Sequence, residues 1–383
     1  MLHYLTTYLT GFKNLSGIKQ HNEQNMNHIH KNWIRPEIQK LTAYHVPDPG
    51  DAIKLDAMEN PYQWDAELIQ KWLQTLQTAA INRYPDPTAR EVKQQLRQRM
   101  QIPDHMDVLL GNGSDELIQM LILSLNGNGR ILLAPEPSFV MYRIIAQIVG
   151  MQYIGVPLEA NDFRLDMFAM LEAIETYQPA LTILAYPNNP TGNAFSTSDI
   201  ETIIETSTGL VVIDEAYAPF ADNTFMSRLE EYPNLLVMRT VSKLGLAGLR
   251  LGLLAGPYEW LEQIDKTRLP YNINVLSQLS AVFALQHYAV LEKQTQQIRA
   301  DRADLLERLN AIDGVQACAS QTNFILFRVA NAPALFELMK KQGILIKCLQ
   351  GSHPLLDNYL RVTVGTPDEN KAFLQALTNF FRK

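Results

Sequence analysis

The fold is decided by the stretch Leu210-Val211-Val212-Ile213-Asp214-Glu215-Ala216-Tyr217 in the middle of the chain. Its first part is a short run of branched apolar residues, which is typical of a β-strand buried on both faces. The run ends at Asp214, and a carboxylate at that depth is unfavourable unless a cation pairs with it. The stretch therefore predicts a strand of a parallel sheet that ends at a polar site.

Apolar runs of the same kind recur on both sides of this stretch, and amphipathic stretches with helical spacing lie between them. This alternation predicts an α/β fold with a mostly parallel sheet covered on both faces. The expected strands are 108–110, 131–134, 181–185, 210–213, 235–238 and 251–255. The clearest of the expected helices are 115–125, 138–149 and 198–205.

The pattern changes after residue 272 and predicts a smaller α+β domain. A helical pattern at 276–309 reads as one long helix or two. Further strands are expected at 323–327, 343–346 and 360–364, and further helices at 332–342 and 368–380. We expect a disordered extension at residues 1–32 and a segment at 33–60 that packs on the small domain. The large domain is expected at 61–275 and the small domain at 276–383.

Length and composition narrow the class of protein. The 383 residues are 46% hydrophobic, which is enough for a large core and two domains. The formal net charge of -7 argues against nucleic acid as a partner. Two cysteines make no disulfide framework, no apolar run is long enough for a membrane span, and the first residues do not resemble a signal peptide, so a cytoplasmic location is expected. No metal site is expected, because no ligand set has zinc spacing.

Polar motifs follow the expected strand ends. They are Gly111-Asn112-Gly113-Ser114-Asp115-Glu116, Pro187-Asn188-Asn189-Pro190-Thr191-Gly192, Asp214-Glu215-Ala216-Tyr217 and Thr240-Val241-Ser242-Lys243, with Arg250 beyond the last of them. In open α/β sheets, ligands bind at the carboxyl edge of the strands. These motifs are therefore expected to meet at one site.

Each motif supplies a group that an aldehyde cofactor with a pyridine ring and a phosphate requires. Lys243 provides an amine for a Schiff base, and Asp214 provides a carboxylate for the ring nitrogen. Tyr217 and Asn189 can both hydrogen-bond the ring oxygen. Together these residues predict catalysis with pyridoxal 5'-phosphate (PLP), bound covalently to Lys243 as an aldimine.

The phosphate of such a cofactor needs N–H groups at a helix start, together with hydroxyls and a cation. The motif at 111–116 opens an expected helix, and it lacks the lysine of a P-loop and the third glycine of a dinucleotide fingerprint. Phe139 follows another strand end and could stack on the pyridine, although a place in the core explains it nearly as well. The residues expected to bind the phosphate are Gly113, Ser114, Thr240, Ser242 and Arg250, and Asp115 is also expected to bind the cofactor.

Taken singly, each motif also has a purely structural explanation. A lone lysine in a strand–helix loop usually lies on the surface, and an aspartate after a strand often caps the next turn. The loop around Asn189, taken alone, could be an ordinary turn. Only the conjunction of the motifs, in one order on one sheet edge, favours a catalytic site.

On these motifs the chain resembles the aminotransferases of PLP fold type I, and in particular the histidinol-phosphate aminotransferases. The resemblance runs from about residue 34 to the C-terminus. Motifs typical of the wider superfamily are Asn189-Pro190-Thr191-Gly192, Asp214 with Tyr217, Ser242-Lys243 and Arg250. Segments typical of the narrower family are Asp56-Ala57-Met58-Glu59-Asn60-Pro61-Tyr62, Asn82-Arg83-Tyr84-Pro85-Asp86-Pro87, the motif at 111–116, Ala247-Gly248-Leu249-Arg250 and Leu360-Arg361-Val362-Thr363-Val364-Gly365-Thr366.

The resemblance implies an aspartate-aminotransferase-like fold and a homodimer with shared active sites, in which Tyr84 reaches the cofactor phosphate of the neighbouring subunit. It implies that Arg361 holds the anionic end of the substrate, although a surface ion pair is its structural alternative. Tyr44 and Asn60 would line the same pocket. Lys347 stands where relatives often have an arginine, and it keeps the charge but loses the bidentate fork. Lys243 and Arg250 are seven positions apart, one fewer than in many relatives.

The expected reaction moves an amino group between glutamate and 2-oxoglutarate on one side and histidinol phosphate and imidazole-acetol phosphate on the other, in L-histidine biosynthesis. A threonine-phosphate decarboxylase and an aromatic or aspartate aminotransferase of the same fold remain alternatives. A transcription regulator is disfavoured, because the leading 33 residues are too few and not basic enough for a DNA-binding module. A non-catalytic binding protein is hard to reconcile with the conjunction of motifs.

Overall fold

The computed structural model describes residues 33–43 and 48–382. The chain divides into two units, Met1–Pro47 and Asp48–Lys383. The described residues of the first unit include the short helix α3 (Pro36–Gln39), which has a proline in its first turn. The predicted extension at 1–32 and the predicted substrate-binding residue Tyr44 lie outside the described residues. Within the described ranges, none of the helices has the length and apolar character needed to cross a membrane.

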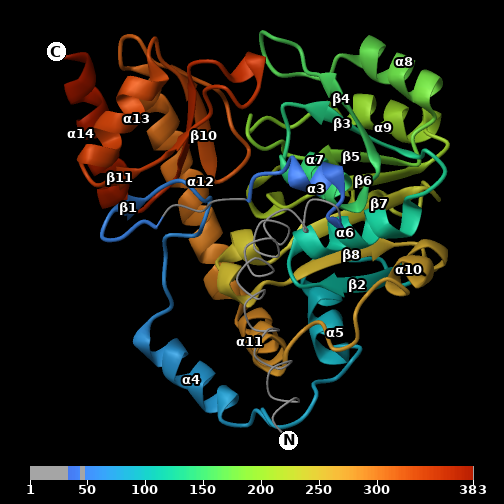
Figure 1. Ribbon diagram of the computed structural model, residues 1–383. Helices are drawn as coiled ribbons and strands as arrows, with labels where there is room; N and C mark the ends of the chain where they lie inside the picture. Colours follow the sequence, from blue (N-terminus) through green and yellow to red (C-terminus); the bar gives the residue numbers. More distant parts are fainter. Residues whose placement is uncertain (1–32, 44–47, 383) are drawn as a thin grey trace, which may run out of the picture. The chain divides into compact units, whose positions relative to one another are not determined.

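The second unit contains a seven-stranded sheet with the order β2-β8-β7-β6-β5-β3-β4, and Figure 1 shows these strands side by side. The strands from β7 to β4 are parallel, whereas β8 is antiparallel to both β2 and β7. The predicted mostly parallel sheet is confirmed, and each predicted strand is present with ends shifted by two residues at most. The strands are β2 (Asp107–Gly111), β3 (Ile131–Glu136), β4 (Gln152–Pro157), β5 (Leu181–Ala185), β6 (Leu210–Asp214), β7 (Leu235–Thr240) and β8 (Gly252–Gly256).

The central strand β6 is covered on both faces, because its side chains alternate between two hydrophobic clusters. Val211 and Ile213 belong to one cluster, and Leu210 and Val212 belong to the other. The first cluster includes residues of α5 (Arg90–Arg99), α8 (Met167–Tyr177), α9 (Thr197–Thr206) and α11 (Val275–Gln286). The second includes residues of α6 (Ser114–Leu125), α7 (Met141–Val149) and α10 (Tyr258–Asp265).

The C-terminal elements, orange to red in Figure 1, build a second, smaller sheet with the order β12-β13-β10-β9 and antiparallel pairing throughout. A short parallel pair, β1 with β11, joins residues 53–54 to this lobe. The lobe has its own core, in which Phe324, Phe327 and Phe373 are fully buried. Its elements are β1 (Ile53–Lys54), β9 (Gln316–Ala317), β10 (Phe324–Arg328), β11 (Ile344–Leu345), β12 (Lys347–Cys348), β13 (Tyr359–Thr363), α12 (Tyr288–Asn310), α13 (Ala332–Lys341) and α14 (Pro367–Phe381).

The helical pattern predicted at 276–309 is divided between two helices, α11 and α12, with His287 between them. The buried residues of α11 pack with the large sheet, whereas Ile298, Leu305 and Leu309 of α12 pack in the smaller core. The predicted domain boundaries stay a prediction. The remaining elements are α4 (Ala66–Leu76) and the 3-10 turns η2 (Ala218–Phe220), η3 (Met226–Arg228), η4 (Ser242–Leu244), η5 (Ala247–Leu249) and η6 (Pro354–Leu356).

The carboxyl ends of four strands meet at one edge of the large sheet. The strands β5, β6 and β7 are parallel to one another, and β2 runs in the same direction as β7 because both are antiparallel to β8. Each of these strands is followed by one of the polar motifs found in the sequence. The topology therefore brings the motifs to the edge where open α/β sheets bind their ligands.

Candidate active site

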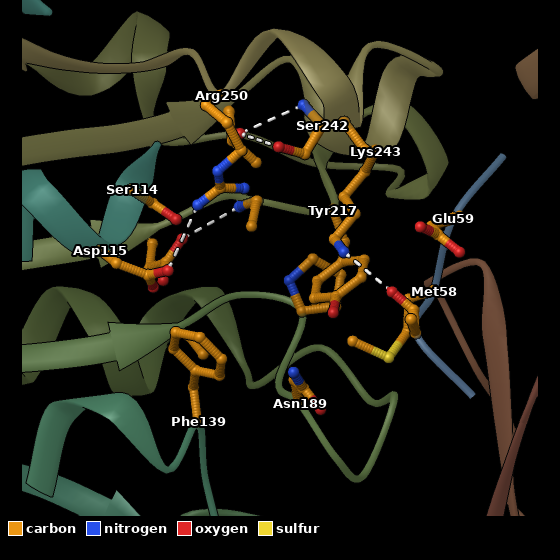
Figure 2. Close-up of a pocket in the computed structure, with 17 residues that line it drawn as sticks. Met58, Glu59, Ser114, Asp115, Phe139, Asn189, Tyr217, Ser242, Lys243 and Arg250 are labelled. Atoms are coloured by element: carbon orange, nitrogen blue, oxygen red, sulfur yellow. Dashed lines mark hydrogen bonds and ion pairs between the residues drawn. The ribbon is translucent and has the colours of Figure 1, made fainter. Parts of the chain in front are cut away.

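A cavity lies at this edge of the sheet, and Figure 2 shows Lys243, Tyr217 and Phe139 reaching into it from different elements. Its walls come from the ends of β5, β6 and β7, from the start of α6 and from residues 57–59. The predicted site residues that line it are Ser114, Asp115, Phe139, Asn189, Asp214, Tyr217, Thr240, Ser242, Lys243 and Arg250.

Lys243 lies in η4, directly after β7, and its side chain crosses the cavity. Its Nζ donates a hydrogen bond to the carbonyl oxygen of Ala57 at 3.4 Å and lies 5.8 Å from the centre of the Tyr217 ring. Burial, reinforced by the nearby guanidinium of Arg361, lowers the pKa of Lys243 to about 8. A fraction of the amine is therefore uncharged near neutral pH, as a nucleophilic lysine requires.

Asp214 is the last residue of β6, and only 4% of it is exposed. Its Oδ2 accepts a hydrogen bond from Tyr142 Oη at 2.6 Å, and its Oδ1 accepts one from the backbone N–H of Ala216 at 3.1 Å. Burial raises the pKa of Asp214 to about 6, although both hydrogen bonds act in the opposite direction. No described cation is among the main causes of this shift. Within the described residues the carboxylate thus has hydrogen-bond donors but no ion-pair partner.

Arg361 on β13 is tied to the cavity wall. Its Nη1 donates to Asn189 Oδ1 at 2.6 Å, and its Nη2 donates to the carbonyl oxygen of Asp56 at 3.0 Å. The guanidinium also lies 5.2 Å from the centre of the Phe324 ring, against which Tyr217 packs edge-on at 5.3 Å. Arg361 is only 8% exposed, so a surface ion pair does not describe it. Burial raises the pKa of Tyr217, and Arg361 opposes that shift.

The start of α6 has the features of an anion site, because its first N–H groups lie at the positive end of the helix. Gly113 precedes it with φ +87°, and a Cβ there would lie 2.5 Å from Arg250 Nη2, so only glycine fits. Arg250 Nη2 lies 3.5 Å from Asp115 Oδ2. Beside them, Ser242 Oγ lies 2.9 Å from Thr240 Oγ1, which also accepts the Ser242 N–H at 3.1 Å. Despite the short spacing after Lys243, Arg250 lines the cavity.

Besides Gly113 and Arg361, three more of the described predicted residues lie outside the cavity lining. Tyr84 is 80% exposed and stacks on Tyr271, with ring centres 4.4 Å apart. Lys347 is exposed on β12, where it pairs in register with Arg361. Asn60 Nδ2 donates to the carbonyl oxygen of Leu244 at 3.2 Å, and this bond ties it to the turn that carries Lys243.

Other cavity residues have no counterpart among the predicted ones. Ala57, Met58 and Glu59 line the cavity; they belong to the family-typical segment 56–62, but the backbone role of Ala57 was not predicted. Met58 is held by a hydrogen bond from its N–H to Thr363 Oγ1 at 3.0 Å. Tyr142 is completely buried behind the wall, and in the sequence it looks like an ordinary core residue of a helix.

The geometry can be compared with known proteins. The model of the family described as Aminotransferase class I and II matches residues 50–377 of this chain. The chain belongs to the class I and II aminotransferases. This aminotransferase is 56% identical over 347 residues to "Histidinol-phosphate aminotransferase 2" of Nitrosococcus oceani, a match that covers 90% of this chain and 96% of that protein. It is 51% identical to a protein of the same name from Cupriavidus pinatubonensis, with 90% and 95% covered.

Solved structures show the same fold. The histidinol-phosphate aminotransferase of Sinorhizobium meliloti in complex with pyridoxal-5'-phosphate matches with a TM-score of 0.80 at 23% identity, covering 91% of this chain and 97% of that one. The L-threonine-O-3-phosphate decarboxylase of Porphyromonas gingivalis matches with a TM-score of 0.74 at 24% identity, covering 86% and 100%. The predicted fold class, PLP fold type I, is confirmed.

Proposed function

We propose that this aminotransferase uses PLP to transfer an amino group between glutamate and imidazole-acetol phosphate, with 2-oxoglutarate and histidinol phosphate as products. The name carried by the Nitrosococcus and Cupriavidus relatives supports this substrate pair, because identity is above one half along nearly their whole length. The reaction is a step of L-histidine biosynthesis, and we propose that the enzyme carries it out in the cytoplasm.

One observation carries the proposal: a lysine with a lowered pKa and a buried carboxylate without a cation line the same cavity. A protonated ring nitrogen would give Asp214 the charged partner that burial demands. The amine of Lys243 would bind the cofactor covalently. The two residues therefore suit the aldehyde and the ring nitrogen of a pyridine aldehyde better than they suit an ion pair with each other.

When bound, PLP withdraws electrons from the substrate and makes the hydrogen on the substrate Cα acidic. Lys243 Nζ would accept that proton. With a pKa of about 8, roughly a tenth of free lysine amine is uncharged at pH 7, which is enough for a general base. Asn189 and Tyr217 would hold the ring oxygen, and Phe139 would cover one face of the ring.

The phosphate end of the cofactor would lie at the start of α6. There the N–H groups that follow Gly113, the hydroxyls of Ser242 and Thr240, and the guanidinium of Arg250 converge on one end of the cavity. Neutral donors and one cation suit a phosphate that is not released during turnover.

Arg361 would bind the anionic end of the substrate, which is the distal carboxylate of glutamate or the phosphate of histidinol phosphate. Its hydrogen bond to Asn189 couples the substrate-binding cation to the residue that contacts the cofactor ring. Lys347, opposite Arg361 on the neighbouring strand, would add a second and more exposed positive charge.

The enzyme would act as a homodimer with shared active sites. Tyr84 is compatible with this part of the proposal, because its ring is 80% exposed and thus accessible to a partner. In the dimer, Tyr84 would hydrogen-bond the cofactor phosphate in the neighbouring subunit.

The test is a parallel assay of the purified protein with PLP and 2-oxoglutarate. Glutamate is measured with histidinol phosphate, phenylalanine and aspartate as amino donors, and O-phosphothreonine is added in a separate reaction with detection of carbon dioxide. We expect the highest kcat/KM for histidinol phosphate. Preference for phenylalanine or aspartate would keep the cofactor site and overturn the substrate. Loss of carbon dioxide from O-phosphothreonine alone would replace transamination by decarboxylation.

A further inference from the structure

One buried tyrosine contacts two walls of the cavity. Tyr142 in α7 has no exposed surface, and its Oη donates to Asp214 Oδ2 at 2.6 Å. The edge of its ring packs against Phe139, with ring centres 5.5 Å apart and planes at 85°. Tyr142 thus joins the carboxylate expected at the edge of the cofactor ring to the aromatic residue expected over its face.

We infer that Tyr142 is a positioning residue, which keeps Asp214 ionised and aimed at the cofactor ring and holds Phe139 in place. The inference rests on the proposed use of PLP. It assigns a task to a residue that lies behind the cavity lining and does not touch the cofactor.

The hydrogen bonds of Asp214 explain the positioning. Oδ2 accepts from Tyr142 and Oδ1 accepts from the Ala216 N–H, so both oxygens are fixed while each keeps further capacity to accept. In the described part of the chain, Tyr142 is the side chain that donates to this carboxylate. Removal of its hydroxyl would free the carboxylate to rotate and take away the stronger of the two donors.

The charges around Asp214 make this donor necessary. Burial and the neighbouring acids Asp115 and Glu215 all disfavour the ionised form, whereas Tyr142 and the Ala216 N–H favour it. Tyr217, which also faces Asp214, stays neutral because burial raises its pKa. No cation is among the main causes of this shift in the described chain, and the hydroxyl of Tyr142 is the largest stabilising one.

Tyr142 is suited to this task at every working pH. Burial, followed by the charge of Asp214, raises its own pKa well above the ordinary value. The hydroxyl therefore keeps its proton and stays a donor, and it never competes with Asp214 for negative charge.

Tyr153 offers a matched control. It is a largely buried tyrosine near the same hydrophobic cluster, and its Oη donates to Glu136 Oε1 at 3.0 Å rather than to Asp214. Tyr142→Phe and Tyr153→Phe each delete one hydroxyl from this part of the fold and keep the ring. A general loss of packing or of buried hydrogen bonds would affect both variants, whereas the inferred task belongs to Tyr142 alone.

The experiment measures the pKa of Asp214 in the full-length protein freed of cofactor, by NMR of 13Cγ-labelled aspartate with Asp214→Asn to assign the signal. The affinity for PLP is then followed by fluorescence as a function of pH. In Tyr142→Phe we expect the pKa of Asp214 to rise by about one unit, so that PLP binds about twofold more weakly at pH 7. Tyr153→Phe should match the unmodified protein in both measurements.

An unchanged pKa of Asp214 in Tyr142→Phe would overturn the inference. If that variant does not fold, 3-fluorotyrosine at position 142 alone, a near-isosteric and stronger donor, should lower the pKa of Asp214, and no change would again overturn it. Failure of the proposed use of PLP looks different, because the unmodified protein would then not bind PLP, and failure of the proposed substrate would show only in the amino-donor assay. The pKa comparison in the cofactor-free protein decides the task of Tyr142 in either case.

Discussion

Asp214 and Glu215 are adjacent acids at the end of β6 with opposite surroundings. Glu215 is 1% exposed, and Arg239 donates to its Oε2 through Nε at 2.9 Å and Nη2 at 2.7 Å. Thr224 Oγ1 donates to the same carboxylate at 2.8 Å. Asp214 is equally buried, faces the cavity and has no cationic partner within the described chain.

The difference indicates that the charge of Glu215 is structural and that the charge of Asp214 is functional. Both carboxylates lose their hydration on folding, and such a loss must be offset by a partner. For Glu215 the chain supplies that partner itself, so the pair can only hold β6 and β7 together. For Asp214 the partner is missing, and the opening beside it is where a cationic ring nitrogen would bind. A buried acid without a cation is therefore the more informative of the two.

Substitution on the cavity side should affect catalysis most strongly. Lys243→Gln removes both the point of covalent attachment and the proton acceptor, so turnover should fall by about 10⁴-fold or more. Thermal stability should not fall, because burial disfavours the charge of Lys243. Initial rates and melting temperatures check both statements, with the exposed Lys293→Gln as the control. Substantial turnover in the Lys243 variant would sink the catalytic assignment.

Substitution on the opposite face should affect stability instead. Glu215→Gln leaves the guanidinium of Arg239 buried without its counter-charge, and we expect a loss of about 3 kcal/mol in the free energy of unfolding. Replacement of both residues, as in Glu215→Gln with Arg239→Met, should recover part of that loss. Denaturant titration measures it. Unfolding of Glu215→Gln at the same denaturant concentration as the unmodified protein would contradict the structural role of Glu215.

The missing partner of Asp214 should appear as a pH dependence of stability. Its pKa rises from 3.8 in the unfolded chain to about 6 in the fold. The folded state therefore binds the proton more tightly, and this stability is complete below pH 3.8 and lost as pH rises through 6. Cofactor-free protein should lose about 2–3 kcal/mol more than Asp214→Asn between pH 4 and 8. Melting curves at several pH values should show this gap, and parallel curves would contradict it.

The smallest effect is expected at Lys347. Because its side chain is exposed, solvent and salt screen its charge, and Lys347→Ala should raise KM for histidinol phosphate only about threefold, with kcat unchanged. Arg361→Gln should raise it far more, since the guanidinium is buried and donates to Asn189, which lines the cavity. Steady-state kinetics at two salt concentrations compares them. Equal increases of KM in the two variants would mean that burial does not decide how strongly each cation binds the substrate.

Much of the large sheet could be predicted from the sequence because its strands are buried on both faces. The run at 210–213 has no polar interruption, so its apolar character identifies it without knowledge of the fold. The edge strand β4 was not predicted, since Gln152 and Pro157 are exposed and most residues between them are only partly buried. Helix α5 escaped for a similar reason, because Val92 and Leu96 are its only buried residues.

The candidate site was predictable where the chemistry depends on side chains in motifs. Lys243 and Asp214 fall in this class, and the sheet topology brings them to one cavity. The parts that were missed depend on tertiary contacts. Ala57 contributes a backbone oxygen, and the hydroxyl of Tyr142 meets Asp214 across 72 positions of sequence, so neither leaves a local signal.

The most direct test of the central claim is to locate the cofactor on the chain. Full-length protein is loaded with PLP, reduced with borohydride, digested and mapped by mass spectrometry. The account predicts one reduced cofactor per chain, carried by the peptide that contains Lys243, with no label in Lys243→Gln. A label on another lysine, or no label in the unmodified protein, would contradict the account.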